Sequence, residues 1–278
     1  MPRSTTSAGT ERPLLGLLLV VELIVAVALV GRAGPSTPVD VSATVPTPSA
    51  AASTTTTTSD GRTVELTSLG GGTTRPLLDR VSREMDDAVA AVTAFWGAEW
   101  PRDIVVVATA SDDQFTALAG GGADIAAATV GQRIVFAQGA AGMSDADLRI
   151  VLRHELFHYA ARAQTAADAP RWLTEGVADF VARPDAPRPG QARAAELAAI
   201  PSDSDLATEG PARALAYDRA WWFTRFVADR YGTPTLRRLY ERTCGKGHSD
   251  VETAVDQVLG ADLGDVLVQW RNWLSRTA

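Results

Sequence analysis

The sequence predicts an α+β protein with a small mixed sheet in an N-terminal lobe, a central helix and a helical C-terminal lobe. Two observations predict this class. Short β-branched or alternating runs, typical of strands, occur up to residue 138 and not beyond it. From residue 212 onward, apolar residues recur at helical spacing in one segment after another. The strands and the helices are thus segregated along the chain, which is the α+β arrangement.

The elements can be placed from these patterns. Two glycines, Gly232 and Gly260, separate helices in the C-terminal half. In chain order we expect a strand at 62–69, an amphipathic helix at 75–96, a buried strand at 104–108, a glycine loop at 120–122, one or two strands within 128–138, and helices at 212–231, 234–244, 250–259 and 263–275.

The N-terminal region predicts export. Residues 14–30 are apolar apart from Glu22, a length between a signal-peptide core and a membrane-spanning helix. Residues 1–33 are therefore a cytoplasmic stub with an uncleaved membrane anchor, which we favour, or a cleaved signal segment, for which Glu22 is the argument, because a carboxylate in lipid is costly. Two arginines before the apolar run and one behind it place the rest of the chain outside.

Residues 34–60 are rich in Thr, Pro, Ser and Ala and contain no aromatic residue, Leu or Ile, so we expect an extended linker. Residues 61–278 then form one domain, or two lobes that share a cleft. The net charge of −7 and the pI near 5.0 argue against nucleic acid as a partner. The single cysteine, Cys244, excludes an intramolecular disulfide.

The segment His154-Glu155-Leu156-Phe157-His158 indicates a catalytic zinc site. Side chains at i and i+4 lie above one another on a helix, so both imidazoles can reach one ion. Glu155 lies beside that face, in the position of a general base acting on a zinc-bound water. Ser144, three residues before Asp147, predicts where this helix begins.

A catalytic zinc usually has three protein ligands, so one more is needed. The metzincin pattern is excluded because Ala161 and Gln164 stand where its glycine and third histidine would be. The other common solution is a glutamate on a second helix. Pro170 predicts that such a helix begins there, with Glu175 and Asp179 sharing one face at i and i+4. Gly176, costly in a helix interior, suggests a close approach to another helix or to the metal.

With Trp172-x-x-Glu175-Gly176-x-Ala178 after the first motif, the chain resembles the gluzincin metallopeptidases, in particular the small bacterial peptidase MA-like domains. The layout covers residues 62–278, but only the two helices match in detail, and the spacing from His158 to Glu175 is short for the family. The resemblance implies a minimal thermolysin-like fold in which His154, His158 and Glu175 bind Zn²⁺ and Glu155 activates water.

The same resemblance implies further roles. Asp179 would orient a zinc-bound imidazole, and the strand before the zinc helix would be an edge strand, so that 130–136 could bind an extended peptide. Gluzincins usually add a donor that stabilises the oxyanion. Tyr217 is the preferred candidate, and His248 the alternative; a core tyrosine and a loop histidine are the plain interpretations of these two residues.

The leading hypothesis is a zinc-dependent endopeptidase that hydrolyses peptide bonds outside the cell, either on a single-pass anchor or secreted. Its partners would be a peptide or protein substrate and, through the N-terminal segment, the membrane. Two alternatives stay open at this point. One is an exported zinc-binding scaffold or interaction domain with little turnover, and the other is a hydrolase of a non-protein amide such as a cell-wall crosslink.

Overall fold

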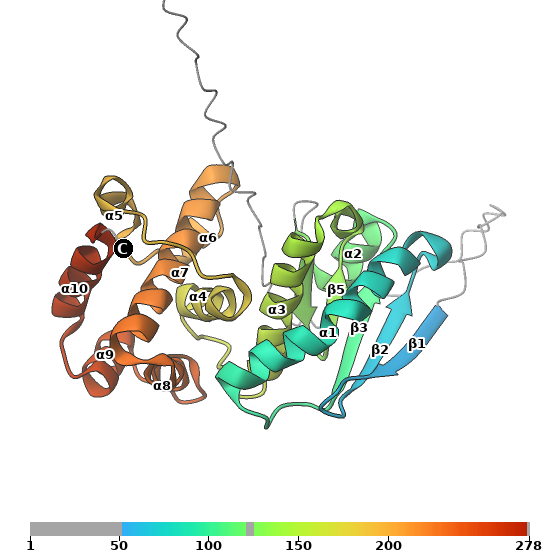
Figure 1. The fold of residues 1–278 in the computed structure, drawn as a ribbon, viewed down its shortest axis with the longest axis horizontal. Helices are drawn as coiled ribbons and strands as arrows, with labels where there is room; N and C mark the ends of the chain where they lie inside the picture. Colours follow the sequence, from blue (N-terminus) through green and yellow to red (C-terminus); the bar gives the residue numbers. More distant parts are fainter. Residues whose placement is uncertain (1–51, 121–124, 277–278) are drawn as a thin grey trace, which may run out of the picture.

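The computed structural model describes residues 52–120 and 125–276. A sheet and the helices that cover it occupy one side of the molecule, and a group of helices occupies the other, with α4 between them (Figure 1). This is the predicted α+β class, with a small mixed sheet in the N-terminal part and a helical C-terminal part.

The sheet in the described residues has the strand order β1-β2-β3-β5-β4. Pairing is parallel between β2 and β3 and between β3 and β5, and antiparallel at both edges. The strands are β1 (Ala52–Thr57), β2 (Thr63–Ser68), β3 (Asp103–Ala108), β4 (Ala127–Val130) and β5 (Arg133–Phe136).

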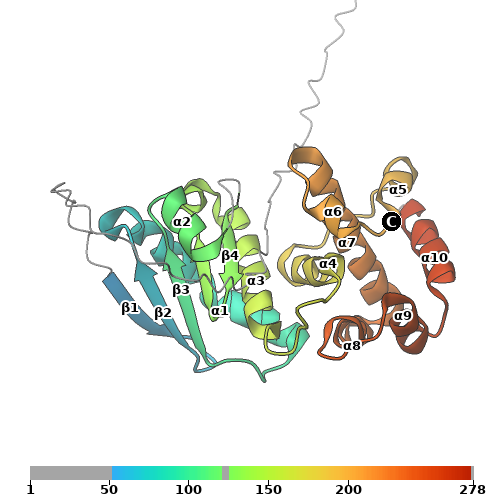
Figure 2. The ribbon, with the colours of Figure 1, turned by 180° about the vertical axis from the view of Figure 1, so that it is seen from behind.

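Helices cover both faces of this sheet. Alternate residues of the inner strands, such as Ile104 and Val106, belong to the main core with α1 (Arg75–Trp96) and α3 (Asp145–Ala161). The intervening residues, such as Val107 and Val135, form a smaller core with α2 (Asp112–Ala119), which Figure 2 shows on the opposite face. The zinc helix predicted from the sequence, α3, is therefore buried against the sheet.

The C-terminal part consists of helices that pack around α7, and α4 packs against both α3 and α7. Two short 3₁₀ helices, at Gly71–Thr73 and Gln138–Gly142, belong to the N-terminal part. The remaining helices are α4 (Arg171–Ala182), α5 (Gln191–Leu197), α6 (Asp203–Leu206), α7 (Gly210–Tyr231), α8 (Thr233–Cys244), α9 (Val251–Leu259) and α10 (Leu263–Ser275).

Two sequence predictions need correction. Residues 52–57, assigned to the linker 34–60, form β1, which pairs antiparallel with β2, so the folded part includes residues before Gly61. The edge strand next to the zinc helix is β4, whereas β5, which makes up most of the segment 130–136, lies between β3 and β4 and has both edges paired. Within the described residues, the outer edge of β4 therefore has no strand partner, whereas both edges of β5 are paired.

The predicted membrane segment at residues 14–30 lies outside the described residues. Within 52–120 and 125–276, no helix has the length and apolar character needed to cross a bilayer. The role of the N-terminal segment stays a prediction.

Candidate metal centre

Helix α3 carries the two histidines into the core. It begins at Asp145 and is capped by Ser144, whose Oγ accepts a hydrogen bond of 3.1 Å from the backbone N–H of Asp147, as the sequence predicts. His154 and His158 lie one turn apart and are 0% and 6% exposed. Polar side chains this deeply buried need partners, because their loss of water is otherwise uncompensated.

Helix α4 supplies those partners from the opposite side. It begins at Arg171 after Pro170 and carries Glu175 and Asp179 toward α3. Its close packing on α7 depends on Gly176: a Cβ atom there would lie 2.8 Å from the carbonyl oxygen of Ala220. Thr224 also donates a hydrogen bond of 2.9 Å to the carbonyl of Gly176. The glycine therefore serves a close helix–helix approach, one of the two explanations proposed from the sequence.

Three side-chain atoms meet between α3 and α4. His154 Nε2 lies 3.0 Å from His158 Nε2 and 3.2 Å from Glu175 Oε2, and the last two atoms are 3.6 Å apart. A tetrahedral zinc ion with ligands at about 2.0–2.1 Å places its ligand atoms about 3.3 Å from one another. The observed separations bracket that value, so the cluster of His154, His158 and Glu175 can hold a metal ion.

The chemistry of the donors also fits zinc. The Nδ1–H of His154 donates a hydrogen bond of 2.9 Å to Asp179 Oδ1, so Nε2 is the ring nitrogen that faces Glu175 and His158. Next to the Glu175 carboxylate, Nε2 needs a positive partner: either a proton of its own or, once the ring is neutral, a cation that its lone pair can bind. Among the described residues, the second carboxylate oxygen, Glu175 Oε1, is buried without a hydrogen-bond partner. Two imidazoles and a carboxylate are a ligand set of catalytic zinc.

The charges in the cluster show the same need for a cation. Burial by itself lowers the pKa of His154, but its hydrogen bonds to Asp179 and Glu175 and their negative charges outweigh this and raise the pKa to about 10. Burial alone would raise the pKa of Glu175, yet the neighbouring His158 and His154 hold it well below its usual range. The site therefore favours a positive charge next to an ionised carboxylate.

Glu155 lies beside this cluster and is 1% exposed. Burial raises the pKa of its carboxyl group, opposed by the nearby His154 and His158 and by a hydrogen bond from Thr129. The Thr129 hydroxyl lies 2.7 Å from Glu155 Oε2, while Oε1 is buried without a partner among the described residues. A carboxylate with a raised pKa and one unpaired oxygen is suited to accept a proton.

Asp179 links the cluster to residues farther from it. Its Oδ2 is 2.6 Å from Arg183 Nη2, and Arg183 Nη1 donates a hydrogen bond of 2.9 Å to Asp218 on α7. The guanidinium also lies over the ring of Trp221, 5.0 Å from its centroid. Asp179 thus has a hydrogen bond to His154 on Oδ1 and an ion-pair contact with Arg183 on Oδ2, and a carboxylate bonded to an imidazole in this way can orient the ring for a metal.

The two candidates for the oxyanion donor differ in their surroundings. Tyr217 is buried on α7, on the face that also carries Ala220 and Thr224 at helical spacing and that packs on α4. His248 has partners at both ring nitrogens, the carbonyl of Ser249 at 2.9 Å and Asp168 at 3.3 Å. This agrees with the plain interpretation of His248 as a loop histidine, and the role of Tyr217 stays a prediction.

Sequence reasoning missed Thr129, Arg183 and Asp218. Arg183 follows Asp179 at i+4, a spacing from which an ion pair could have been predicted. The contacts of Thr129 with α3 and of Asp218 with α4 join residues 26 and 35 positions apart along the chain. No local pattern predicts these pairs.

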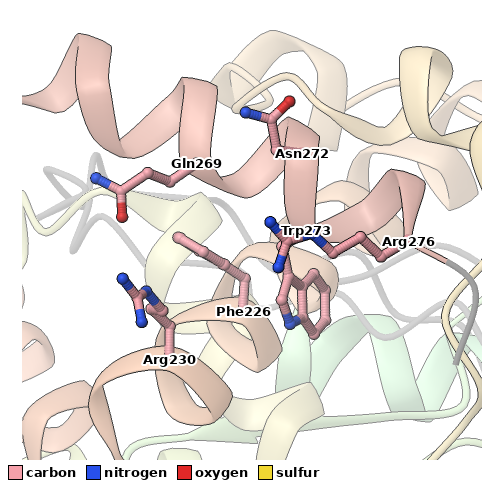
Figure 3. Close-up of a pocket in the computed structure, with 6 residues that line it drawn as sticks. All are labelled: Phe226, Arg230, Gln269, Asn272, Trp273 and Arg276. Atoms are coloured by element: carbon pink, nitrogen blue, oxygen red, sulfur yellow. The ribbon is translucent and has the colours of Figure 1, made fainter.

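A surface pocket lies apart from the cluster, between α7 and α10 (Figure 3). Its volume is about 340 Å³, and Phe226 and Trp273 form its apolar wall beside Arg230 and Arg276. None of the three candidate metal ligands lines it.

Two comparisons with known sequences bear on the chain. The family described as the eCIS core domain matches residues 90–166, a stretch that contains the His154–His158 motif but is less than half of the 278-residue chain. Curated proteins give no significant match by sequence.

Solved structures show similarity to zinc peptidases. A variant of a two-domain M1 zinc metallopeptidase with bound L-arginine matches with a TM-score of 0.49 and 17% identity, over 82% of this chain and 52% of that one. The M1 zinc metallopeptidase from Deinococcus radiodurans matches at 0.47 and 19%, over the same shares. Legionella pneumophila aminopeptidase A matches at 0.47 and 16%, over 79% of this chain and 27% of that one.

The chain spans about half the length of the two M1 enzymes and less of the third.

Proposed function

We propose that the chain is a zinc-dependent peptidase in which His154, His158 and Glu175 hold the metal and Glu155 is the general base. The observation that carries this proposal is the meeting of three buried donor atoms, 3.0–3.6 Å apart, beside a buried carboxylate with one oxygen that has no hydrogen-bond partner among residues 52–120 and 125–276. A purely structural zinc site is usually closed by a fourth protein ligand and has no use for such a base. Within the described residues, the cluster comprises three ligands.

Each residue has a distinct task in hydrolysis. Zinc, when bound, supplies Lewis-acid chemistry: it polarises a carbonyl oxygen and makes water more acidic. Glu155 accepts a proton from the attacking water and donates it to the leaving amine, a task to which a carboxyl group with a raised pKa is suited. Asp179 keeps the His154 ring in the orientation that directs Nε2 toward Glu175 and His158. Tyr217 would donate a hydrogen bond to the oxyanion.

The free edge of β4 is where we propose that an extended peptide binds. Ala137 N–H donates to the carbonyl of Ala126, at 2.9 Å, which identifies that pair as hydrogen-bonded. Because antiparallel pairs alternate, the backbone groups of Ala127 and Thr129 then point away from β5, toward the edge that has no strand partner in the described part of the chain. A substrate strand added there would run past Thr129, the residue that contacts Glu155.

We further propose that the enzyme is an endopeptidase that acts outside the cell, on an anchor formed by residues 14–30 or released by cleavage after it. Capped peptides, with both termini blocked, separate this activity from that of an aminopeptidase, which needs a free amino terminus. Cleavage of capped peptides supports the endopeptidase assignment. Cleavage of peptides with free termini alone contradicts it and favours an aminopeptidase. The mass of the native protein shows whether the segment is cleaved.

The decisive test of catalysis compares the wild type with Glu155→Gln, each loaded with zinc, on an unfolded protein and on capped peptides. Glutamine keeps the shape of the side chain but cannot accept the proton. We expect turnover to be lost while one zinc per chain is retained. Equal turnover in both proteins contradicts the mechanism. Bound zinc without turnover in either protein favours the scaffold alternative. If a cell-wall amide is added as a third substrate, turnover of that substrate alone favours the amide-hydrolase alternative.

A further inference from the structure

Thr129 joins the free sheet edge to the proposed base. It lies on β4, and its side chain shares a face with Ala127, which belongs to the main core under α3, whereas Ala128 belongs to the core on the opposite face. The side chain is 1% exposed. Its Oγ1 lies 2.7 Å from Glu155 Oε2 and 2.9 Å from the carbonyl oxygen of Glu155.

This hydroxyl is the sole hydrogen-bond donor to the Glu155 side chain among the described residues. A threonine in a strand has a stiff χ1 angle, so its hydroxyl is fixed relative to the sheet. The bond to Oε2 therefore fixes one rotamer of the Glu155 side chain. No other hydrogen bond in the described chain restrains this carboxylate. It leaves Oε1 as the oxygen available to accept a proton.

We propose that Thr129 is a positioning residue for the reaction: its hydroxyl holds Glu155 Oε2, and its backbone N–H and C=O face the edge where the substrate strand would bind. This inference rests on the proposed peptidase function. Thr129 would then have two tasks: its backbone would set the register of a substrate that pairs with β4, and its side chain would orient Glu155. One rigid strand, β4, would thus both bind the substrate and position the base.

The test compares Thr129→Val, which removes the hydroxyl and keeps the shape, with Thr129→Ser, which keeps the hydroxyl. Thr109→Val is the matched control, because Thr109 is equally buried and its hydroxyl donates a bond of 3.0 Å to the carbonyl of Phe136, away from Glu155. We expect Thr129→Val to lower kcat about 10- to 100-fold, the loss typical of one hydrogen bond to a charged group. KM and zinc content should not change, and Thr129→Ser and Thr109→Val should retain most of the activity.

A second measurement does not depend on turnover. Crystal structures of the zinc-free proteins should show the Glu155 carboxylate displaced in Thr129→Val and unmoved in Thr129→Ser. Thr129→Ala replaces the valine variant if that one does not fold. A carboxylate that stays in place without the hydroxyl overturns the proposal, as does a displaced carboxylate with wild-type kcat.

The two failures can be told apart. If the wild type is inactive with zinc bound, the peptidase function fails, and the crystal structures alone decide whether Thr129 holds Glu155. If the wild type is active and Glu155→Gln is not, but Thr129→Val matches the wild type, the peptidase function stands and the role of Thr129 falls.

Discussion

Gly176 offers the clearest link between helix packing and the metal centre. It follows the candidate ligand Glu175 directly, and α4 is packed between α3 and α7. A Cβ atom at this position would lie 2.8 Å from the oxygen and 3.0 Å from the carbon of the Ala220 carbonyl. Both are backbone atoms of α7, which cannot rotate away, so Gly176→Ala must push the two helices apart.

The magnitude follows from two opposing effects. Alanine favours a helix over glycine by about 1 kcal/mol, whereas overpacking a well-filled interior costs about 1–3 kcal/mol. The net expectation is a loss of about 0–2 kcal/mol in the free energy of unfolding. Gly139→Ala is the control, because a Cβ atom there meets nothing within 4 Å. It should gain about 0.4–1 kcal/mol.

Urea unfolding of the zinc-free proteins, followed by tryptophan fluorescence, measures both values. Because α4 carries Glu175, its displacement from α7 should also weaken zinc binding in Gly176→Ala and leave it unchanged in Gly139→Ala. A Gly176→Ala protein as stable as Gly139→Ala, with wild-type zinc affinity, would refute the reasoning.

Three further predictions concern the polar groups of the site. Asp179→Asn should lower zinc affinity about 10- to 100-fold, because the His154 ring loses the carboxylate that orients it; competition with a chromophoric chelator measures this, and unchanged affinity contradicts the role. Arg183→Met should weaken zinc binding in the same assay by less than Asp179→Asn, since it removes the ion pair to Asp179 and leaves the carboxylate; a larger loss would place Arg183 closer to the metal. Zinc binding at pH 8 should release about one proton from His154, because its pKa of about 10 keeps it protonated in the metal-free protein and a zinc ligand must be neutral; calorimetry in buffers of different ionisation enthalpy counts the protons, and a count of zero contradicts the raised pKa.

Local patterns predicted the long helices well, whereas the short helices α2, α5 and α6 were missed. The bounds of α1 (Arg75–Trp96) and α10 (Leu263–Ser275) are those expected from helical periodicity. Helix α7 begins two residues earlier than expected, at Gly210, because Pro211 can occupy the first turn, where its missing N–H is not needed. The two helices of the site were predictable because their ligands follow helical spacing.

The sheet was harder to predict, for physical reasons. The threonine run in β1 has the composition of a linker, and it forms a strand because β2 offers an unpaired edge. The insertion of β5 between β3 and β4 depends on parallel pairing between segments far apart in sequence. Thr129 could not be recognised for the same reason, since its contact with Glu155 exists only after β4 packs on α3.

The three-ligand metal centre is the claim on which the other inferences depend. A crystal structure of the zinc-loaded protein, with anomalous scattering measured at the zinc edge, tests it directly. We predict one zinc ion bound by His154 Nε2, His158 Nε2 and the Glu175 carboxylate at about 2.0–2.1 Å, with the fourth position not filled by protein. Zinc bound by other residues, a fourth protein ligand, or no zinc peak after loading would contradict the account.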